Sequence, residues 1–444
     1  MIAASIGFAE EPAWSYRHDD PPRRPIDLQA RIDAAALRGG GRVVVPKGRW
    51  LTDPIELKSN VELHLSDGCE LLFTDELKKY LPAVRTTYEG TECYNYRPLI
   101  HSLGATNVAI TGCGKIEPQM GRWETWRWNG EGTRKAKAML ADWGNRDVPV
   151  EDRDLTKIPE AKTRPPFVEF NGCSDVRLEG FELRNSPFWC IHLLNCERAT
   201  VRGLSVSSFL NNSDGLDIEC TRDVLVEDCS FDQGDDVIVL KSGKDRDGRR
   251  RARPTENVTI RRCRAGSGHG FLVVGSECSG GVRNVTMEDC VVDGTLDTLF
   301  KVKTTPKRGG FVKGITMRRV KARTIITTVI DVTAAYALNG SSDGAEDVLT
   351  EIDGLVVEDV EVAEAGRRLS AVGDARRPIR NLVVRNVVLG TSARQDIVEN
   401  AFGDVVCSLM ADANSIVVDS NRPFKLVADG KSYPVMKGKN VYER

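Results

Sequence analysis

Residues 223–231 read DVLVEDCSF, a turn residue followed by apolar side chains that alternate with polar ones. Alternation with a period of two is typical of a short strand that buries one face. The same pattern returns as NVTIRRCRA at residues 257–265 and as NVTMEDCVV at residues 284–292. The first stretch is therefore one copy of a repeat, and the repeat decides the fold.

Ten segments share this pattern, and most copies start 24 to 40 residues apart. They start at Asn60, Asn107, Asp175, Ala199, Asp223, Asn257, Asn284, Gly314, Gly354 and Asn381. A repeat of this length predicts stacked units, each of which buries its apolar face against the next. Because each unit carries one strand pattern and no long helix, the sequence predicts an all-β chain. The expected architecture is a right-handed parallel β-helix of about ten or more coils rather than a sandwich.

Two sets of cysteines follow the repeat. They are Cys229, Cys263 and Cys290, at one place in successive copies, and Cys173, Cys196 and Cys220, near the strand starts. Free cysteine is among the most buried residue types, so we interpret both sets as stacked core thiols. The twelve cysteines form no CxxC pair, and the sequence therefore gives no indication of a zinc site, a redox motif or a cofactor.

The two ends of the repeat region are read differently. Residues 26–41 have helical apolar spacing and end in three glycines, which predicts a helix that caps the first coil. Residues 1–25 start with a short apolar run but have no basic segment before it, so they are a signal-peptide remnant or a disordered start. The first alternative implies a secreted or periplasmic protein, and the second a cytoplasmic one. Residues 26–444 are expected to form a single domain.

The pattern lapses between about residues 115 and 166, where the chain carries Trp123, Trp126, Trp128 and Trp143. We expect a long loop or excursion from the solenoid. Its tryptophans either form a local core or line one wall of a sugar cleft, and the sequence leaves both alternatives open.

Composition excludes two partner classes. The net charge is −2, whereas a general nucleic-acid binder is usually basic. No run of about 18 apolar residues is present, so we expect no membrane span.

Acidic and basic side chains recur in step with the coils. Asp214 lies near the end of one coil, Asp235 and Asp236 near the end of the next, and His269 one coil further. Lys301 and Lys303 follow on the coil after that. Equivalent places on successive coils stack about 4.8 Å apart. The sequence therefore predicts one stripe of three carboxylates, an imidazole and two ammonium groups.

This set suits inverting glycoside hydrolysis, in which one carboxyl group protonates the leaving oxygen and another carboxylate activates water. The lysine pair would hold a substrate carboxylate, which indicates a uronic-acid polymer. Two alternatives remain open: a β-helical polysaccharide lyase and a carbohydrate-binding solenoid without enzyme activity.

Four short motifs carry a family resemblance. They are Asn212-Ser213-Asp214, Gly234-Asp235-Asp236, Gly268-His269-Gly270 and Lys301-Val302-Lys303. In this order they resemble glycoside hydrolase family 28, the polygalacturonase family, over residues 26–336. The resemblance implies hydrolysis of α-1,4-linked galacturonic acid in pectin, and other pectic uronides remain possible substrates.

The resemblance also implies the role of each residue. Asp235 is the general acid, Asp214 and Asp236 activate the attacking water, and His269 supports the acid. Lys301 and Lys303 bind the uronate carboxylate, and Tyr336 contacts the sugar. Lys301 departs from the arginine usual in the family, so this position has a point charge instead of a bidentate fork.

Further stretches, such as KSGKDRDGRRRARPTENV at residues 241–258, resemble the bacterial and often exo-acting branch. Arg249 and Arg250 in this stretch are expected to form a second carboxylate clamp; the alternative is a solvated charge run. His192 lies one coil before Asp214 and is interpreted as a coil histidine that could border the site.

The remaining acidic residues near the motifs are given no catalytic role. Asp217, Glu219, Asp223, Glu227 and Asp228 are expected to be turn and outward-face residues, and Asp232 is left unassigned.

Overall fold

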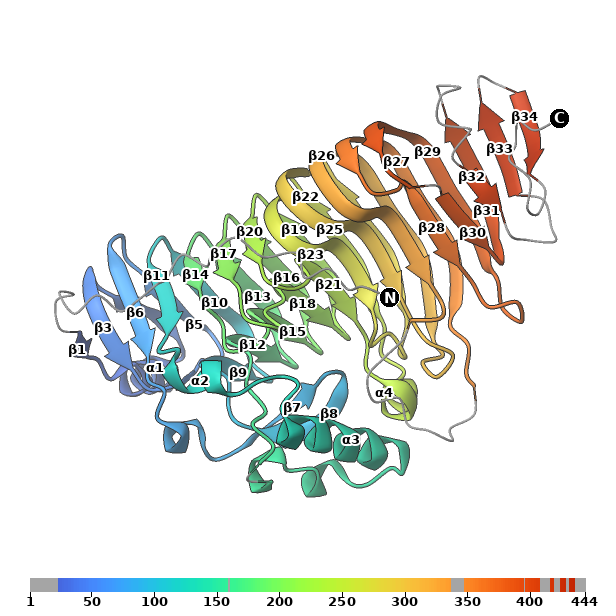
Figure 1. Ribbon diagram of the computed structural model, residues 1–444. Helices are drawn as coiled ribbons and strands as arrows, with labels where there is room; N and C mark the ends of the chain where they lie inside the picture. Colours follow the sequence, from blue (N-terminus) through green and yellow to red (C-terminus); the bar gives the residue numbers. More distant parts are fainter. Residues whose placement is uncertain are drawn as a thin grey trace.

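The chain is described here from a computed structural model, in which it winds into the predicted right-handed parallel β-helix (Figure 1). The structure describes residues 23–158, 160–336, 347–394, 396–407, 416–418, 424–428 and 431–435. The expected signal remnant or disordered start falls almost wholly on residues 1–22, outside the described residues. In the part of the chain that is described, no helix is long and apolar enough to cross a membrane.

The ten predicted strands all lie in one parallel stack, which we call the repeat stack. Its members are β2 (Gly41–Val45), β5 (Val61–Leu65), β10 (Thr106–Gly112), β13 (Ser174–Glu179), β16 (Glu197–Arg202), β19 (Arg222–Glu227), β22 (Thr255–Arg261), β24 (Val282–Glu288), β26 (Phe311–Thr333), β27 (Glu351–Ala365), β29 (Ile379–Ser392), β31 (Ala401–Cys407) and β33 (Phe424–Ala428). The last described strand, β34 (Lys431–Val435), pairs with β33 in the antiparallel sense.

One register runs through the repeat stack: Val224 pairs with Val258, which pairs in turn with Val285. In all ten copies, the residue just before the position of Val224, Val258 and Val285 has a φ between 51° and 70°. These residues are Asn60, Asn107, Asp175, Arg198, Asp223, Asn257, Asn284, Gly314, Gly354 and Asn381. Glycine, asparagine and aspartate adopt this left-handed conformation at low cost, which explains why most copies of the repeat begin with one of them.

We expect Asn284→Val to lower the free energy of unfolding by about 2 kcal/mol, because a β-branched residue is strained in the left-handed region. Asn284→Gly is the matched control and should cost less than about 1 kcal/mol. Both variants lose the hydrogen bond from the Asn284 amide to Asn257 Oδ1 at 3.3 Å. Denaturant unfolding measures the two losses, and equal values would show that the hydrogen bond, rather than the backbone conformation, dominates.

Two further stacks complete each coil. The middle stack begins with β1 (Arg24–Pro25), β3 (Gly48–Thr52), β6 (Cys69–Phe73), β11 (Lys115–Pro118), β14 (Glu182–Arg184), β17 (Ser205–Ser208) and β20 (Ser230–Gln233). It continues through the first parts of β23 (Arg264–Gly275) and β25 (Val291–Lys303), the middle of β26 and the last parts of β27 and β29. The site stack contains β4 (Ile55–Glu56), β9 (Ile100–Leu103), β12 (Val168–Asn171), β15 (Ile191–Leu194), β18 (Leu216–Glu219), β21 (Ile238–Lys241), the last parts of β23, β25 and β26, then β28 (Leu369–Val372), β30 (Asp396–Glu399) and β32 (Ile416–Val418).

The interior of the solenoid is one continuous hydrophobic cluster that extends from Ile26 to Ala401. Cys229, Cys263 and Cys290 lie inside it as a stack of free thiols, each at most 2% exposed. The prediction of buried core thiols is therefore confirmed for this set.

The predicted capping helix is confirmed as α1 (Leu28–Leu37). The Asp27 side chain begins the helix by accepting a hydrogen bond from the Ala30 N–H at 3.0 Å. Leu28, Ile32 and Ala35 are buried where α1 packs on β2, β4 and β5, so the helix covers the apolar start of the solenoid.

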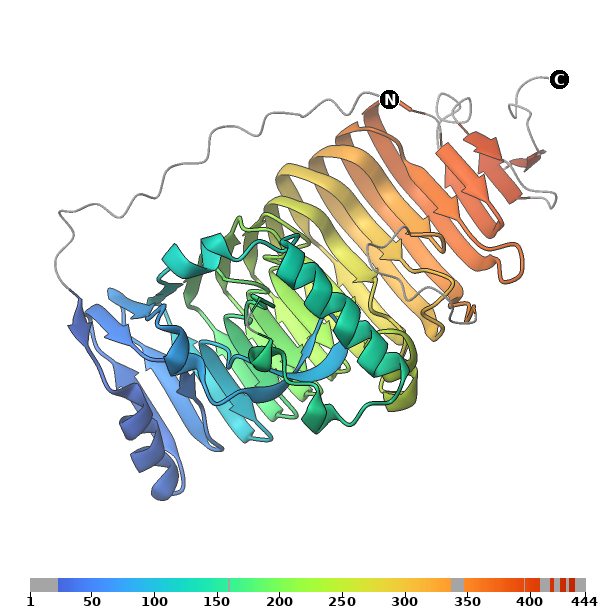
Figure 2. The ribbon, with the colours of Figure 1, turned by 60° about the horizontal axis from the view of Figure 1, so that its bottom comes forward.

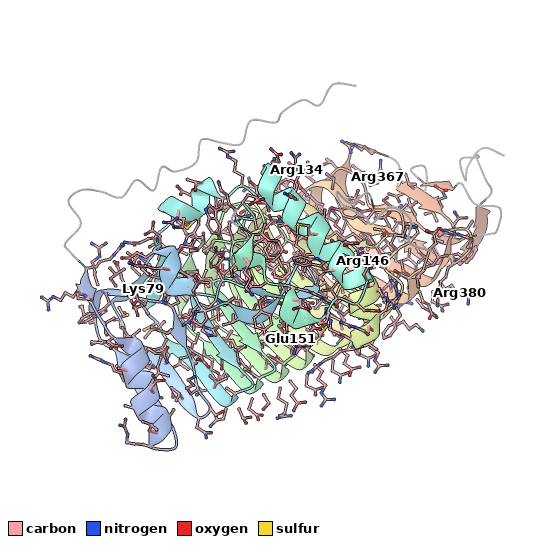
Figure 3. The ribbon with its side chains drawn as sticks, turned by 90° about the horizontal axis from the view of Figure 1, so that it is seen from below. Lys79, Arg134, Arg146, Glu151, Arg367 and Arg380 are labelled. Carbon is pink, nitrogen blue, oxygen red and sulfur yellow. The ribbon has the colours of Figure 1, made fainter. Side chains whose placement is uncertain are left out.

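Two excursions leave the solenoid beside the site stack. The first is the antiparallel hairpin β7 (Val84–Tyr88) and β8 (Thr91–Asn95), which follows the 3₁₀ helix η1 (Leu77–Tyr80). The second carries α2 (Gly121–Thr125), α3 (Glu131–Asn145), η2 (Val150–Asp152) and η3 (Leu155–Lys157). Figure 2 shows α3 in front of the coils, and Figure 3 shows it from below, with Arg134 near its start and Arg146 just past its end.

The segment expected to be a long loop or excursion, at about residues 115–166, leaves the coils only after β11 and contains the 15-residue helix α3. The buried apolar face of α3 consists of only Ala136, Leu140 and Ala141, so the helix has a weak signal in the sequence. Trp123 contacts Trp126 edge to face at a ring-centroid distance of 5.4 Å, and both side chains are buried. Both side chains belong to the continuous hydrophobic cluster of the solenoid, so for these two tryptophans the structure shows neither a separate local core nor an exposed wall.

Candidate active site

The predicted carboxylates and His269 lie where the chain enters the site stack, and the lysine pair lies at the end of β25. Asp214 precedes β18 and Asp236 precedes β21, and Leu216 pairs with Ile238 in the two strands. Asp214 and Asp236 therefore occupy equivalent places on successive coils. The other predicted residues follow on the second of these coils and the next two: Asp235, His269, Lys301 and Lys303.

The Asp235 carboxylate is surrounded by three nitrogen atoms. It accepts hydrogen bonds from the N–H groups of Asp236 at 2.9 Å and Asn212 at 3.1 Å, and His269 Nδ1 lies 3.1 Å from its Oδ1. Burial raises the pKa of Asp235, but the hydrogen bond and the charge of His269 outweigh it and lower the pKa to about 2. The hydrogen bond to Asp235 raises the pKa of His269. In the free protein the pair therefore holds a proton on the imidazole.

Two lysines and a tyrosine border this pair. Lys303 Nζ donates a hydrogen bond to Asp236 Oδ2 at 2.6 Å. The ammonium groups of Lys301 and Lys303 lie 5.9 and 5.7 Å from the centroid of the Tyr336 ring. The fold thus brings a cation pair and a phenol next to the adjacent carboxylates.

The same cluster contains the residues that could hold a metal ion. One ligand atom each of Asp235, Asp236 and His269 lies within 4.8 Å of the others, and this is the one such group among the residues that the structure describes. Lys303 already places a positive charge against Asp236. The cluster can therefore balance its carboxylates with protein cations.

Asp214 and Asp236 are the two buried carboxyl groups of the predicted set. Asp214 is 4% exposed. Burial, and then the charge of Asp217, raises the pKa of Asp214 well above its usual range, while the Lys241 ammonium 3.4 Å away opposes the shift. Asp214 is therefore well suited to take up a proton.

Asp217 and Glu219, which are expected at turns or on the outward face, are enclosed by the rest of the chain. Ile218 between them faces the solenoid core, so the two carboxylates do lie on the outer face of β18. Both are nevertheless fully buried, because the hairpin covers this face and Thr87 Oγ1 donates a hydrogen bond to Glu219 Oε2 at 2.8 Å.

His192 lies between two buried carboxylates beneath the hairpin. Its Nδ1 is 3.0 Å from Glu169 Oε2, and its Nε2 is 3.2 Å from Glu219 Oε2. Thr86 Oγ1 donates to the same Glu169 oxygen at 2.6 Å, which fastens β7 to the site stack. Burial alone would lower the pKa of His192, but the hydrogen bonds to the two glutamates raise it to about 9. The imidazolium therefore supports the hairpin electrostatically.

The tip of the hairpin reaches α4 (Asp245–Arg251), which follows β21. The Gly90 carbonyl accepts hydrogen bonds from the Lys244 N–H at 2.9 Å and from the Arg251 guanidinium at 2.8 Å. A Cβ atom on Gly90 would lie 2.6 Å from Glu277 Cγ, so a side chain at this position would displace the loop after β23. The hairpin tip is thus fixed between two later segments of the chain.

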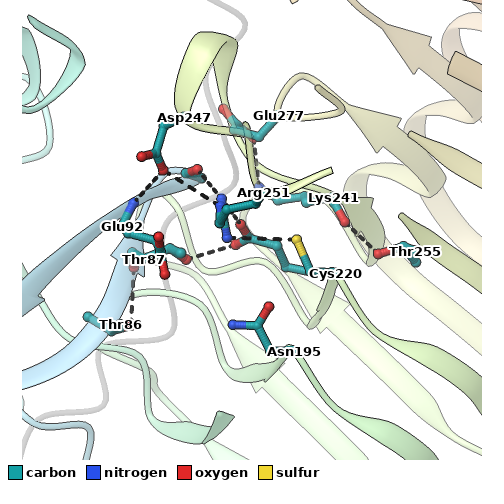
Figure 4. Close-up of polar contacts among 12 residues, drawn as sticks. Thr86, Thr87, Glu92, Asn195, Cys220, Lys241, Asp247, Arg251, Thr255 and Glu277 are labelled. Atoms are coloured by element: carbon teal, nitrogen blue, oxygen red, sulfur yellow. Dashed lines mark hydrogen bonds and ion pairs between the residues drawn. The ribbon is translucent and has the colours of Figure 1, made fainter. Parts of the chain in front are cut away.

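Asp247 of α4 joins the excursions to one another. It accepts hydrogen bonds from the Glu92 N–H at 3.1 Å and from the buried Arg153 guanidinium at 2.8 Å. Figure 4 shows Asp247 between Glu92 and Arg251. Hairpin, α3 and α4 also contact one another, and together they form a wall along the outer face of the site stack, which we call the hairpin wall.

Arg249 and Arg250 lie on α4, within this wall. Arg249 donates hydrogen bonds to the carbonyls of Lys307 and Arg308 at 2.7 and 3.0 Å. Arg250 binds Asp247 at 2.8 Å. None of the ion pairs and hydrogen bonds of these two described side chains reaches Asp214, Asp235 or Asp236, so their expected role as a second carboxylate clamp stays a prediction.

Arg164 contacts the site but belongs to none of the four sequence motifs. Arg164 is 3% exposed and donates hydrogen bonds to the Asn211 carbonyl at 3.0 Å and to Asn212 Oδ1 at 3.2 Å. It therefore holds the loop that leads to Asp214. Because Arg164 comes from the end of the second excursion, only the folded chain reveals the contact.

Comparison with known proteins gives consistent findings. The family model of glycosyl hydrolases family 28 matches residues 150–407. An exo-poly-alpha-D-galacturonosidase of Dickeya chrysanthemi is 24% identical over 340 residues, which span 71% of this chain and 55% of that protein. An endo-polygalacturonase of Pectobacterium carotovorum is 23% identical over 355 residues, spanning 76% and 81% of the two chains. The crystal structure of an exopolygalacturonase from Thermotoga maritima matches this structure with a TM-score of 0.75 and 30% sequence identity. The match covers 91% of this chain and 88% of the Thermotoga chain.

Proposed function

Because this chain belongs to glycosyl hydrolases family 28, we propose that it hydrolyses the α-1,4 bonds between galacturonic acid units of pectin or pectic oligosaccharides. One observation carries the proposal: the adjacent Asp235 and Asp236 lie beside His269 and the lysine pair of β25. Cleavage of a uronic-acid chain needs both parts, carboxyl groups for the bond and cations for the carboxylate of the sugar.

In the proposed inverting reaction, Asp235 donates a proton to the glycosidic oxygen, and that C–O bond breaks. Asp214 and Asp236 accept a proton from a water molecule, whose oxygen forms the new bond to the anomeric carbon from the opposite face. Asp236 is held in place by Lys303 at 2.6 Å, and Asp214 occupies the equivalent place one coil earlier. This arrangement supports their shared role as the base.

The proton that Asp235 donates is supplied by the pair with His269. In the free protein the low pKa of Asp235 and the raised pKa of His269 place the proton on the ring. A bound sugar excludes water from the pair, and removal of water disfavours both charged forms. The proton then moves along the 3.1 Å hydrogen bond to Asp235, which becomes the acid.

Lys301, Lys303 and Tyr336 form the proposed site for the galacturonate carboxylate. Both ammonium groups face the same tyrosine ring, so a carboxylate beside the ring would meet two cations. An ammonium group acts as a point charge without the fork of arginine. Recognition at Lys301 therefore relies on charge more than on a fixed bidentate geometry.

The hairpin wall supports exo action. It covers the outer face of the coils that precede the carboxylates, and its tip is pinned by Lys244 and Arg251. A wall beside the carboxylates limits the number of sugar units that bind on that side. We therefore propose that the protein removes units from a chain end.

Product analysis on polygalacturonate and its oligomers tests this function. We expect short products to accumulate while the polymer stays long, and NMR to detect the β anomer in the newly released end. A rapid loss of viscosity would show endo action, and an unsaturated product that absorbs in the ultraviolet would show a lyase.

A parallel panel of rhamnogalacturonan and xylogalacturonan fragments tests the substrate. Faster cleavage of either one would move the assignment to that pectic uronide. Binding without cleavage of any member would instead indicate a carbohydrate-binding solenoid.

A further inference from the structure

One buried ammonium group faces three carboxylates at the edge of the proposed site. Lys241, the last residue of β21, is 5% exposed. Its Nζ lies 3.2 Å from Asp217 Oδ1, and 3.4 Å from both Glu277 Oε2 and Asp214 Oδ2. The centroid of the Trp189 ring is 4.0 Å from the same nitrogen. Lys241 thus has negative charge on several sides and an aromatic face on another.

The surroundings fix this ammonium group in place. Figure 4 shows Lys241 next to Glu277. The main-chain carbonyl of Lys241 accepts a hydrogen bond from Thr255 Oγ1 at 2.6 Å. A cation over an aromatic face is attracted by the ring, and more strongly where water is excluded. Lys241 therefore differs from a surface lysine, whose head is free to move in water.

Asp214 and Asp217 depend on this one cation. Both Asp217 oxygens are buried without a hydrogen-bond partner, and the Lys241 ammonium is their ion-pair partner. Among the described residues, no other cation lies within ion-pair distance of Asp214 or Asp217. Glu277 is different, because Lys244 and Arg308 also act on it.

We propose that Lys241 is a positioning residue for water activation: its ammonium group opposes the protonation of Asp214 and holds this carboxyl group in place against the charges of Asp217 and Glu277. The inference rests on the proposed function, in which Asp214 accepts a proton from water. Neighbouring buried carboxylates repel one another and take up protons. A protonated Asp214 could not act as a base, so the reaction needs a compensating charge at this point.

Every element packed against the group contributes to this balance. The ionisable groups that face Lys241 or its three partners are Asp235 and Asp236 before β21, His192 of β15, Lys303 of β25, and Lys244 and Arg308 around Glu277. Burial raises the pKa of Asp217 to about 7, with Lys241 opposing the rise. Asp217 is thus poised between its two protonation states near neutral pH, whereas the burial of Glu277 is outweighed by the charges of Lys241 and Arg308, which lower its pKa.

The test is the pH dependence of kcat/KM on an oligogalacturonate for Lys241→Met. In such a profile kcat/KM falls at low pH, on the acid limb, where the base takes up a proton. Loss of a charge 3.4 Å from Asp214 should move this limb to higher pH by about one pH unit or more. Lys241→Arg keeps the charge and should leave the limb in place, even where the maximum rate falls. A purely structural lysine would instead lower the rate of Lys241→Met without moving the limb, and this result would overturn the inference.

Glu277→Gln is the opposite perturbation and keeps the test decisive if Lys241→Met does not fold. Removal of this negative charge should move the acid limb downwards, and the double variant should bring the limb back towards the parent value. An unmoved limb in Glu277→Gln would also overturn the inference. Arg368→Met is the matched control, because Arg368 pairs with the buried Asp396 at 2.8 Å on a distant coil. It should lose stability and keep the parent pH profile.

Failure of the proposed function gives a different result. If the unmodified protein cleaves no galacturonide, both the function and the inference fall. If it cleaves the substrate but the acid limb of the variants stays at the parent pH, the proposed function stands and only the role of Lys241 is wrong.

Discussion

Asp235→Asn should lower kcat on galacturonate oligomers by about 10²- to 10⁴-fold, the range typical of a lost general acid. Asparagine keeps the shape of the side chain and can still accept hydrogen bonds from Asn212 and from the next residue in the chain. It cannot pass the His269 proton to the glycosidic oxygen. KM should change little, because Asp235 is not part of the proposed carboxylate site. Steady-state kinetics, with thermal unfolding to confirm the fold, measure both effects.

Asp232→Asn is the matched control for this substitution. Asp232 is exposed on β20, three residues before Asp235, and its loss should change kcat by less than about twofold. Asp214→Asn distinguishes the remaining assignment. Full activity in Asp235→Asn combined with a large loss in Asp214→Asn would transfer the acid role to Asp214, whose pKa is raised by burial.

His192→Gln should lower the free energy of unfolding by about 3–5 kcal/mol, the cost of breaking a buried ion pair from one side. The substitution leaves Glu169 and Glu219 buried without the imidazolium between them. The hairpin is fastened to the same two carboxylates through Thr86 and Thr87, so its attachment weakens as well. Chemical denaturation at neutral pH measures the loss.

The pH dependence separates charge from packing in this cluster. The pKa of His192 is raised from 6.5 to about 9 in the folded protein, so its stabilisation is complete below about 6.5 and is lost as the pH rises through about 9. The stability curves of the parent and His192→Gln should converge at high pH, and a constant gap would show that packing alone is lost. His64→Gln is the control: His64 is 30% exposed and bound to Thr111, and its loss should cost less than about 0.5 kcal/mol.

The solenoid could be predicted because its cause is local. Each coil repeats a turn residue and an alternating strand, so Asn257 and Asn284 both reveal a left-handed turn and a buried strand after it. The same spacing placed Asp214, Asp235, Asp236 and His269 just before consecutive site-stack strands, and the lysine pair at the end of the next one. Asp236, Lys303 and His269 meet in the structure because the coils are in register.

The hairpin wall and the buried charged residues behind the predicted carboxylates could not be predicted in this way. Asp217 and Glu219 have the alternation of an exposed strand face, and their burial depends on a hairpin more than 120 residues earlier in the chain. Lys241 follows an apolar run and gives no sign that Asp214 and Glu277 converge on it. Such contacts arise from irregular excursions, which have no period in the sequence.

The pinned tip of the hairpin also constrains the order of folding during synthesis. Coils of a solenoid contact only their neighbours, so they can form one after another as the chain emerges. Gly90 has to wait for Arg251, which is 161 residues later, and Glu92 for Asp247, which is 155 residues later. The early coils are therefore complete before the wall can close over Asp217 and Glu219. The coils that carry the first proposed catalytic carboxylates can thus form early, and the wall beside them closes only after Arg251 has been synthesised.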